Sequence, residues 1–408
     1  MPPLTPPVTL PGVERRIAAL LARPDVVAAR DWIESHDAAT VERQCRMAGI
    51  PAPTFAEIKR AAFVAAEMRV IGLEDVRIDD IGNVLGRYGE GSGPGVMLVS
   101  HLDTVFPAGT DLTLTANGSR LTAPGIGDNA RGLAALLAIA EACVACRVQT
   151  STPITFVASV GEEALGDLRG VKHLFQPSAF SLQPKAFIAL DGPGLDRIVH
   201  RALGTRRLRA TFAGPGGHSW AAFGVPNPAH AVGIAAAQIA EIPLPATPRT
   251  ALSVVRLGGG QSVNTIPTEA WLELDLRSES DAALAALYES VTGALKRALD
   301  VVNRKRASGT APLTLATQSL SDRPSGVTPE PHPLVQAALA ATRALGGSPA
   351  LATASTDANV PISLGIPAVA LGAGGKGGDA HLESEWYDNS GGPAGIVRAL
   401  LVALGAGC

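Results

Sequence analysis

The sequence predicts an α/β protein in which a mixed, mostly parallel sheet is flanked by helices and interrupted by an inserted α+β domain. Apolar strands and helices alternate from Val96 to about residue 203 and again near the end of the chain, which is typical of βαβ units. Between these regions, the predicted elements follow the order β-α-β-β-α-β of a ferredoxin-like sandwich. We therefore assign residues 1–203 and 313–408 to the α/β domain and residues 204–312 to the insertion.

The composition of the 408 residues is that of an ordinary globular protein, with 46% hydrophobic and 17% charged residues. A net charge of −3 supplies no basic surface for nucleic acid or anionic membrane, so we expect a small-molecule substrate instead. There is no signal-peptide pattern and no window near the roughly 20 apolar residues of a membrane span, so we expect a cytoplasmic protein. The cysteines are too few for a disulfide framework, and the pair at 143 and 146 is expected to pack in the core. The four are Cys45, Cys143, Cys146 and Cys408.

The chain is predicted to begin with helices and to continue with two short strands. Apolar residues recur at spacings of three and four in the helical segments, and Pro51 and Pro53 break the chain ahead of the third. The predicted helices are residues 12–21, 27–36 and 54–68, and the predicted strands are residues 76–81 and 83–87.

The strand that starts at Val96 ends in two side chains that can bind metal, His101 and Asp103. Ligands of open α/β sheets bind beyond the carboxyl ends of strands, so this position favours chemistry over packing. About 25 residues later, Asp128 lies on a glycine-rich turn ahead of a predicted helix at residues 133–145. Taken alone, a histidine beside an aspartate is more often a hydrogen-bonded surface pair, and an aspartate such as Asp128 before a helix is usually an N-cap.

Two further apolar strands end in carboxylates. Residues 154–158 lead to Glu162 and Glu163, and the strand at residues 186–190 leads to Asp191 after a helix near residues 168–175. Adjacent glutamates are usually solvated, but an apolar strand that should be covered on both faces leads directly into these two. We therefore expect the polar side chains that follow the strands to converge on one edge of the sheet.

The insertion carries two glycine-rich turns, residues 214–219 with His218 and residues 258–267 with Asn264. The permissive backbone of glycine explains the turns but explains neither His218 nor Asn264. The predicted strands of the sandwich are residues 206–212, 251–257, 271–276 and 313–319, and its predicted helices are residues 227–242 and 281–302.

The last segment returns to the α/β pattern. It contains a helix at residues 334–345, a buried strand at residues 366–371 and a final helix at residues 392–404. A glycine-rich run between the last two leads to the sequence Asp379-Ala-His381-Leu-Glu-Ser-Glu385.

A set of short motifs, in order along the chain, resembles the dinuclear zinc exopeptidase family, which includes peptidase T, glutamate carboxypeptidase, aminoacylase and acyl-ornithine deacylase. Each motif is short, but the combination is highly specific and spans residues 50 to 386. The motifs are SHLDTV, PGIGDNARG, GEEALGDLRG, ALDGPG, GPGGHS, SVNTIP, ELDLRS, STDANVPISLGIP and DAHLESE.

The resemblance implies two divalent metal ions per subunit, zinc by preference, with cobalt or manganese accommodated by the same nitrogen and oxygen donors. It assigns His101 and Asp191 to one metal, Glu163 and His381 to the other, and Asp128 to both. It implies that Asp103 accepts the far ring N–H of His101, and that Glu162 is the general base acting on a metal-bridged water.

The resemblance also implies that the insertion is a lid and dimerisation domain, so that the protein is a homodimer. The positions of His218 and Asn264 contact the reacting carbonyl in this family, and that of Arg277 binds a substrate carboxylate. Arg277 could instead be a surface arginine on a strand, and His218 could simply cap its own turn.

The function that follows is hydrolysis of an amide bond in a small substrate, first of all a di- or tripeptide with a free amino terminus. Aspartate at position 191 favours the peptidase T and dipeptidase branch. The alternatives are an N-acyl amino acid amidohydrolase, a carboxypeptidase or an aromatic-amine aminohydrolase at the same site. A catalytically silent binding protein is a third class, against which the intact Glu162 and the complete ligand set argue.

Overall fold

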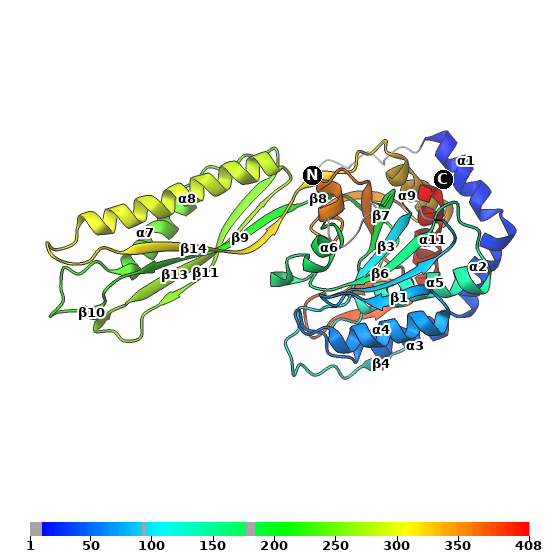
Figure 1. Ribbon diagram of the computed structural model, residues 1–408, viewed down its shortest axis with the longest axis horizontal. Coiled ribbons are helices and arrows are strands. Elements are labelled where there is room, and N and C mark those ends of the chain that lie inside the picture. The colour runs from blue at the N-terminus through cyan, green and yellow to red at the C-terminus, as the bar shows by residue number, and fades with distance from the viewer. Residues whose placement is uncertain (1–9, 92–94, 177–183, 408) are drawn as a thin grey trace. The chain divides into compact units, whose positions relative to one another are not determined.

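The computed structural model describes residues 10–91, 95–176 and 184–407, and the chain divides into two compact units (Figure 1). Unit 1 comprises Met1–Ala202 and Val327–Cys408, and unit 2 comprises Leu203–Gly326. The first boundary falls one residue from the predicted position. The second lies after Gly326 rather than after residue 312, because β14 (Thr314–Arg323) pairs with β9 (Gly204–Ala213) inside unit 2.

Unit 1 is built on a nine-stranded sheet whose four central strands are parallel. The predicted mixed sheet is therefore confirmed, and the carboxyl ends of the central strands meet at one edge. The central strands are, in spatial order, β6 (Ile154–Ser159), β3 (Val96–His101), β7 (Ala186–Leu190) and β17 (Ala368–Leu371). The flanking strands are β1 (Glu74–Ile78) and β2 (Val84–Tyr88) on one side and β8 (Arg197–Ala202), β15 (Gly326–Val327) and β16 (Ala350–Ala354) on the other.

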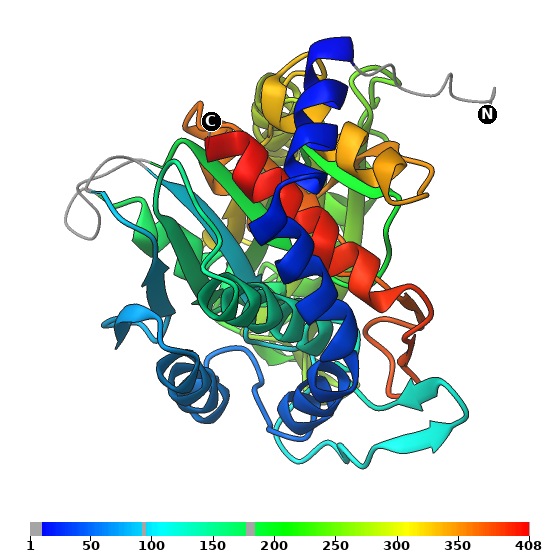
Figure 2. The same cartoon turned by 90° about the vertical axis from the view of Figure 1, so that its right-hand side faces the viewer.

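Helices cover both faces of this sheet because successive strand residues point to opposite sides. Leu98 and Phe156 pack into the larger core, whereas their neighbours Met97 and Val157 pack into a smaller core on the other face. The larger core is covered by α1 (Pro11–Leu21), α2 (Pro24–Ser35), α3 (Asp37–Ala48), α4 (Ile58–Ile71), α5 (Ala130–Ala145), α9 (Pro333–Ala344) and α11 (Gly392–Gly407). The smaller core is covered by α6 (Arg169–Leu174) and α10 (Asn359–Ser363). In Figure 2, α11 crosses in front of the strands with α1 and α2 beside it.

Several short or polar elements were not predicted. Helix α3 follows α2 after a single residue, His36, and two of its four buried residues, Thr40 and Gln44, are polar, so the apolar spacing of its sequence is incomplete. A small four-stranded sheet near the site has strands of only three residues, too short for an alternating pattern. Its members are β4 (Thr115–Asn117), β5 (Arg120–Thr122), β18 (Lys376–Gly378) and β19 (Trp386–Asp388).

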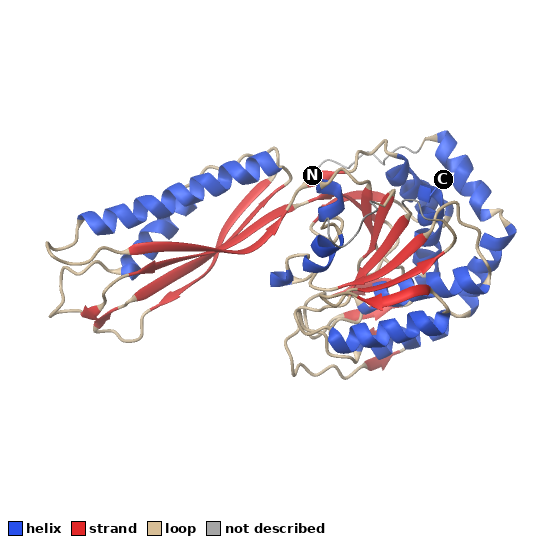
Figure 3. Cartoon of the chain, viewed as in Figure 1, coloured by secondary structure: helices blue, strands red, loops and turns tan. Residues whose placement is uncertain are grey.

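Unit 2 is the predicted ferredoxin-like sandwich (Figure 3). Its antiparallel strands follow the order β11 (Thr250–Gly259), β13 (Glu269–Ser278), β9 and β14, and α7 (Pro228–Ala240) and α8 (Asp281–Arg304) cover one face. Asn227 and Ser280 begin the two helices by accepting hydrogen bonds from the N–H groups of Ala229 and Ala283. A two-stranded ribbon, β10 (Gly217–His218) and β12 (Thr265–Ile266), joins the two glycine-rich turns.

Cys45, Cys143 and Cys146 are free thiols, and Cys408 lies outside the described residues. Of the pair expected in the core, Cys143 is buried and Cys146 is partly buried against the larger core. Across the described ranges, every helix is too short or too polar to cross a membrane.

Candidate active site

The carboxyl edge of the unit 1 sheet gathers the side chains that the sequence placed after its strands. His101 is the last residue of β3, Glu163 follows β6, and Asp128 lies on the turn before α5. Ligand atoms of these three residues lie within 4.8 Å of one another. Asp191, after β7, and His381, from the loop between β18 and β19, reach the same cluster.

Asp128 lies between two imidazoles and presents a different oxygen to each. Its Oδ1 is 3.0 Å from Nε2 of His101, and its Oδ2 is 3.3 Å from Nε2 of His381. Nε2 of His381 also lies 3.1 Å from Oε1 of Glu163, and Nε2 of His101 lies 3.9 Å from Oδ1 of Asp191. The five predicted ligands are therefore brought together as two groups that share Asp128.

The hydrogen bonds of His101 determine which of its nitrogens can bind a cation. Nδ1 lies 3.0 Å from the backbone carbonyl of Asp103, and because a carbonyl only accepts, Nδ1 carries the proton. In the neutral ring, Nε2 then carries a lone pair, and this lone pair faces the buried Oδ1 of Asp128. Two acceptors 3.0 Å apart repel each other unless a proton or a metal cation lies at this position.

Asp103 differs in detail from the sequence expectation. We predicted that its carboxylate accepts the His101 ring N–H, but the carboxylate is 3.5 Å away and the carbonyl is the acceptor. The buried carboxylate instead accepts the backbone N–H groups of Glu162 and Glu163, at 2.9 and 3.0 Å, and the hydroxyl of Thr54. Burial acts to raise the pKa of Asp103, but His101 and these amides outweigh it and lower that pKa.

The charges of the cluster are strongly coupled. Burial and the charge of Asp128 raise the pKa of Asp191 to about 7, and hydrogen bonds to Asp128 and Glu163 raise the pKa of His381 to about 10. Burial opposes protonation of His101, but Asp103 and Asp128 outweigh it and raise its pKa. Burial likewise opposes ionisation of Asp128, yet the two imidazoles lower its pKa.

Neighbouring positive charge thus stabilises the ionised forms of Asp103 and Asp128, whereas burial and the charge of Asp128 disfavour the ionised form of Asp191. A divalent cation would supply that charge without protons, and imidazole and carboxylate are donors that such cations accept. The donor set therefore fits a metal centre.

Glu385 is a functional candidate that the sequence analysis missed. It is almost fully buried, and its carboxylate accepts the N–H groups of Gly125, Gly127 and Asp128 at 3.0, 2.8 and 2.7 Å. Burial raises its pKa to about 7 although these amides act in the opposite direction. Glu385 thus holds the turn that presents Asp128 to the two imidazoles.

Asn129 fixes the other side of the same turn. Its side chain donates to the Leu190 carbonyl and to Ser100, and it accepts the N–H groups of Gly132 and Gly192. The peptide bond between Asp128 and Asn129 is cis. Asn129 therefore links the strand ends that carry His101 and Asp191 to the start of α5.

The remaining predicted residues lie in unit 2. Nδ1 of His218 accepts the N–H groups of Trp220 and Ala221, at 3.2 and 3.4 Å, so the neutral ring carries its proton on Nε2. The carbonyl of Asn264 accepts the N–H of Ser219, which holds the two glycine-rich turns together. Arg277, on β13, forms an ion pair with Asp275 at 2.9 Å.

Comparisons with known proteins bear on the fold and the site together. Residues 97–403 match the peptidase family M20/M25/M40. The succinyl-diaminopimelate desuccinylase of Corynebacterium glutamicum is 28% identical over 259 residues, which cover 62% of this chain and 69% of that protein.

Two solved structures share the fold at lower identity. A tripeptidase from Staphylococcus aureus aligns with a TM-score of 0.74, and the aminopeptidase PepT from Bacillus cereus with a TM-score of 0.71. Each is 20% identical to this protein, and each alignment covers 90% of this chain and 98% of the other. The family match, which extends over most of the chain, confirms the resemblance read from the motifs. The chain belongs to the peptidase family M20/M25/M40 and is a hydrolase that acts on amide bonds.

Proposed function

We propose that the protein is a two-metal amidohydrolase in which Asp128 would be a ligand shared by the two ions. His101 and Asp191 would complete the ligands of one ion, and Glu163 and His381 those of the other. The observation that carries this proposal is that the two oxygens of Asp128 face two different imidazoles, at 3.0 and 3.3 Å. The donors suit zinc, and they would also accept cobalt or manganese.

Glu162 is the general base in this proposal. Bound divalent ions polarise an amide carbonyl and make water more acidic. Glu162 is almost fully buried beside the metal ligand Glu163, and Asp103 holds its backbone N–H at 2.9 Å. Its carboxylate also acts electrostatically on His101 and is thus close to the cluster. It would accept a proton from water and pass it to the departing amine nitrogen.

Residues of unit 2 would complete the site. Because Nδ1 of His218 is held as an acceptor, its Nε2–H is available to donate to the oxygen of the reacting carbonyl. Asn264 is hydrogen-bonded to the same turn and would also contact the reacting carbonyl. Arg277 would bind a substrate carboxylate. We propose that unit 2 also forms a homodimer, so that His218 acts in the site of the partner subunit.

The proposed substrate is a di- or tripeptide with a free amino terminus. A second candidate is an N-acyl amino acid, because the 28% identical relative is named a desuccinylase. Both reactions hydrolyse an amide, and they differ in what lies on the acyl side of the bond.

A substrate panel separates the two candidates. Metal-loaded enzyme would be offered di- and tripeptides, the same peptides with acetylated amino termini, and N-acetyl and N-succinyl amino acids, with release of free amine as the readout. The proposal expects cleavage of the unblocked peptides only, and Glu162→Gln, prepared identically, controls for contaminating hydrolases. Cleavage of the N-acyl amino acids instead would establish the second candidate. No cleavage of any amide by fully loaded enzyme would contradict both.

A further inference from the structure

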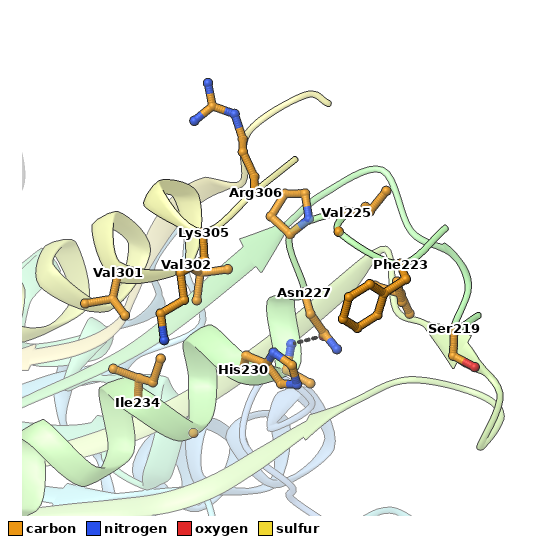
Figure 4. Close-up of a pocket in the computed structure, with 15 residues that line it drawn as sticks. Ser219, Phe223, Val225, Asn227, His230, Ile234, Val301, Val302, Lys305 and Arg306 are labelled. Atoms are coloured by element: carbon orange, nitrogen blue, oxygen red, sulfur yellow. Dashed lines mark hydrogen bonds between the residues drawn. The ribbon is translucent and has the colours of Figure 1, made fainter. Parts of the chain in front are cut away.

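Unit 2 contains a pocket of about 740 Å³, which lies within the size range of small-molecule sites (Figure 4). It is bounded by the start of α7, the end of α8 and the loop that leads from the His218 turn into α7. Its lining residues include Ser219, Phe223, Val225, Asn227, His230, Ile234, Ile266, Val301, Val302, Lys305 and Arg306.

The walls of the pocket are mainly apolar. Val302 and Ile266 are 7% and 8% exposed and form its buried surface, whereas the ring of Phe223 is 88% exposed. A phenylalanine this accessible beside an apolar cavity loses the favourable free energy of burial unless something covers it. The walls therefore suit an apolar group of a ligand.

The polar groups of the pocket are basic or neutral. The lining contains Lys305, His230 and Arg306 but no carboxylate. Arg306 donates to the carbonyls of Asn303 and Thr310, and in Figure 4 its guanidinium points away from the cavity. The amino group of Lys305 points towards Ile234 and the helix that carries His230.

Neither Lys305 nor His230 has a side-chain hydrogen bond or an ion pair within the described part of the chain. An ammonium group at the margin of an apolar cavity attracts a carboxylate, and an imidazole N–H that lines the same cavity can also donate to one. Asn227 is already engaged, since its side chain caps α7 by accepting the N–H of Ala229 at 2.9 Å. The charge of the pocket thus complements an anion, and its walls complement an apolar body.

We propose that this pocket binds an amphipathic monocarboxylate, with its carboxylate at Lys305 and His230 and its acyl or aryl-alkyl body against Phe223, Ile234 and Val302. The lining residues of the pocket all belong to unit 2 and the proposed metal ligands to unit 1, and binding does not depend on the proposed reaction. The rival occupant is a second copy of unit 2, which would cover the same apolar surface.

Calorimetric titration of the full-length, metal-loaded protein with sodium octanoate tests this proposal. Octanoate should bind, 1-octanol should bind at least about tenfold more weakly because it lacks the charge, and acetate and octylammonium should not bind. Lys305→Met keeps the length of the side chain and should weaken octanoate binding about tenfold or more. Lys296→Met removes an exposed lysine from the same helix outside the pocket and should leave binding unchanged.

Two further variants change the cavity itself. Val301→Trp should fill it and abolish binding, and Ile234→Glu should repel the carboxylate, with the fold of each checked by circular dichroism and thermal unfolding. Octanoate that coordinates the active-site metals would bind all these variants equally, and that result would overturn the proposal. So would the absence of binding at millimolar octanoate, or a Val301→Trp protein that loses only its oligomeric state.

Discussion

Asp103 connects the chemistry of the site to its backbone through two different groups. Its carbonyl fixes the protonated nitrogen of His101, and its carboxylate holds the N–H groups of Glu162 and Glu163. Thr54 donates to the same carboxylate, and the carbonyl of Leu102 accepts from the buried guanidinium of Arg60 at 2.8 Å. The orientation of His101, a proposed ligand, and the position of Glu162, the proposed base, therefore depend on a single buried residue.

The adjacent glutamates should have different mutant phenotypes. Glu162→Gln removes the proton acceptor but no proposed ligand, so it should keep its metal and lose roughly a hundredfold to ten-thousandfold in kcat. Glu163→Gln should lose metal, because it removes a carboxylate that faces His381. Metal analysis and steady-state kinetics on both variants provide the measurement. Near-normal turnover in Glu162→Gln would show that the base is another residue.

His200 should make the folded state sensitive to mild acid. Burial lowers the pKa of His200, and the charge of Arg201 acts in the same direction. The hydrogen bond from Nδ1–H of His200 to the carbonyl of Thr328, at 2.8 Å, acts in the opposite direction but does not outweigh them. Below pH 6.5 the unfolded chain binds a proton at this residue and the folded chain does not, so stability falls as pH decreases. Above pH 6.5 the ring is neutral in both states and the effect disappears.

The matched variant for this effect is His200→Asn, whose amide can keep the bond to Thr328. Urea unfolding in chelator, at pH 7.5 and 5.5, should show that the wild type loses more stability on acidification than the variant. Equal losses in the two proteins would mean that His200 does not contribute.

Among the structural elements, the turn from Gly125 to Asp128 has a geometry imposed from far along the chain. Three of its N–H groups donate to Glu385, and a side chain at Gly127 would meet the Glu385 carboxylate at 3.0 Å. The position of Asp128 between the two imidazoles thus depends on the segment that also carries His381.

Glu385→Gln should therefore weaken metal binding without unfolding the protein. The side-chain NH2 of glutamine would replace one of the Glu385 oxygens that now accept backbone N–H groups of the turn. A backbone N–H donor would then face another donor instead of an acceptor. Changes of this kind at groups that orient metal ligands typically cost 10–100-fold in affinity, and competition with a chromogenic chelator would measure it. An unchanged affinity with intact fold would show that Asp128 holds its position without Glu385.

The elements that the sequence predicted are those with a strong local pattern. The central strands are continuous apolar runs, and α8 has both an N-cap and an apolar stripe, so each was found within a few residues. The three-residue strands around β5 are defined by their pairing rather than by their own sequence. Glu385 was missed for a similar reason, since its partners are backbone amides about 260 residues away in the chain, and backbone amides leave no sequence signal.

At the scale of the whole molecule, the central question is whether two chains build each site. If His218 acts in the partner subunit, homodimers of Glu162→Gln and of His218→Ala should both be nearly inactive. In a mixed dimer, one site then carries both defects and the other carries neither. With equal amounts and random exchange, half of the dimers are mixed, so activity should recover to about a quarter of the wild-type value.

The control for this experiment is a labelled mixture that demonstrates subunit exchange. If His218 acts within its own chain, every site in a mixed dimer carries one defect. A mixture that exchanges subunits and stays as inactive as its parents would therefore rule out the shared site.

The measurement that tests the two-metal account most directly is metal content determined on the same samples as amide hydrolysis. Elemental analysis of gel-filtered enzyme should find close to two divalent ions per chain. Stepwise removal with a strong chelator should abolish hydrolysis, and zinc, cobalt or manganese should restore it. An enzyme that hydrolyses its substrate at full rate after all metal has been removed would contradict the account.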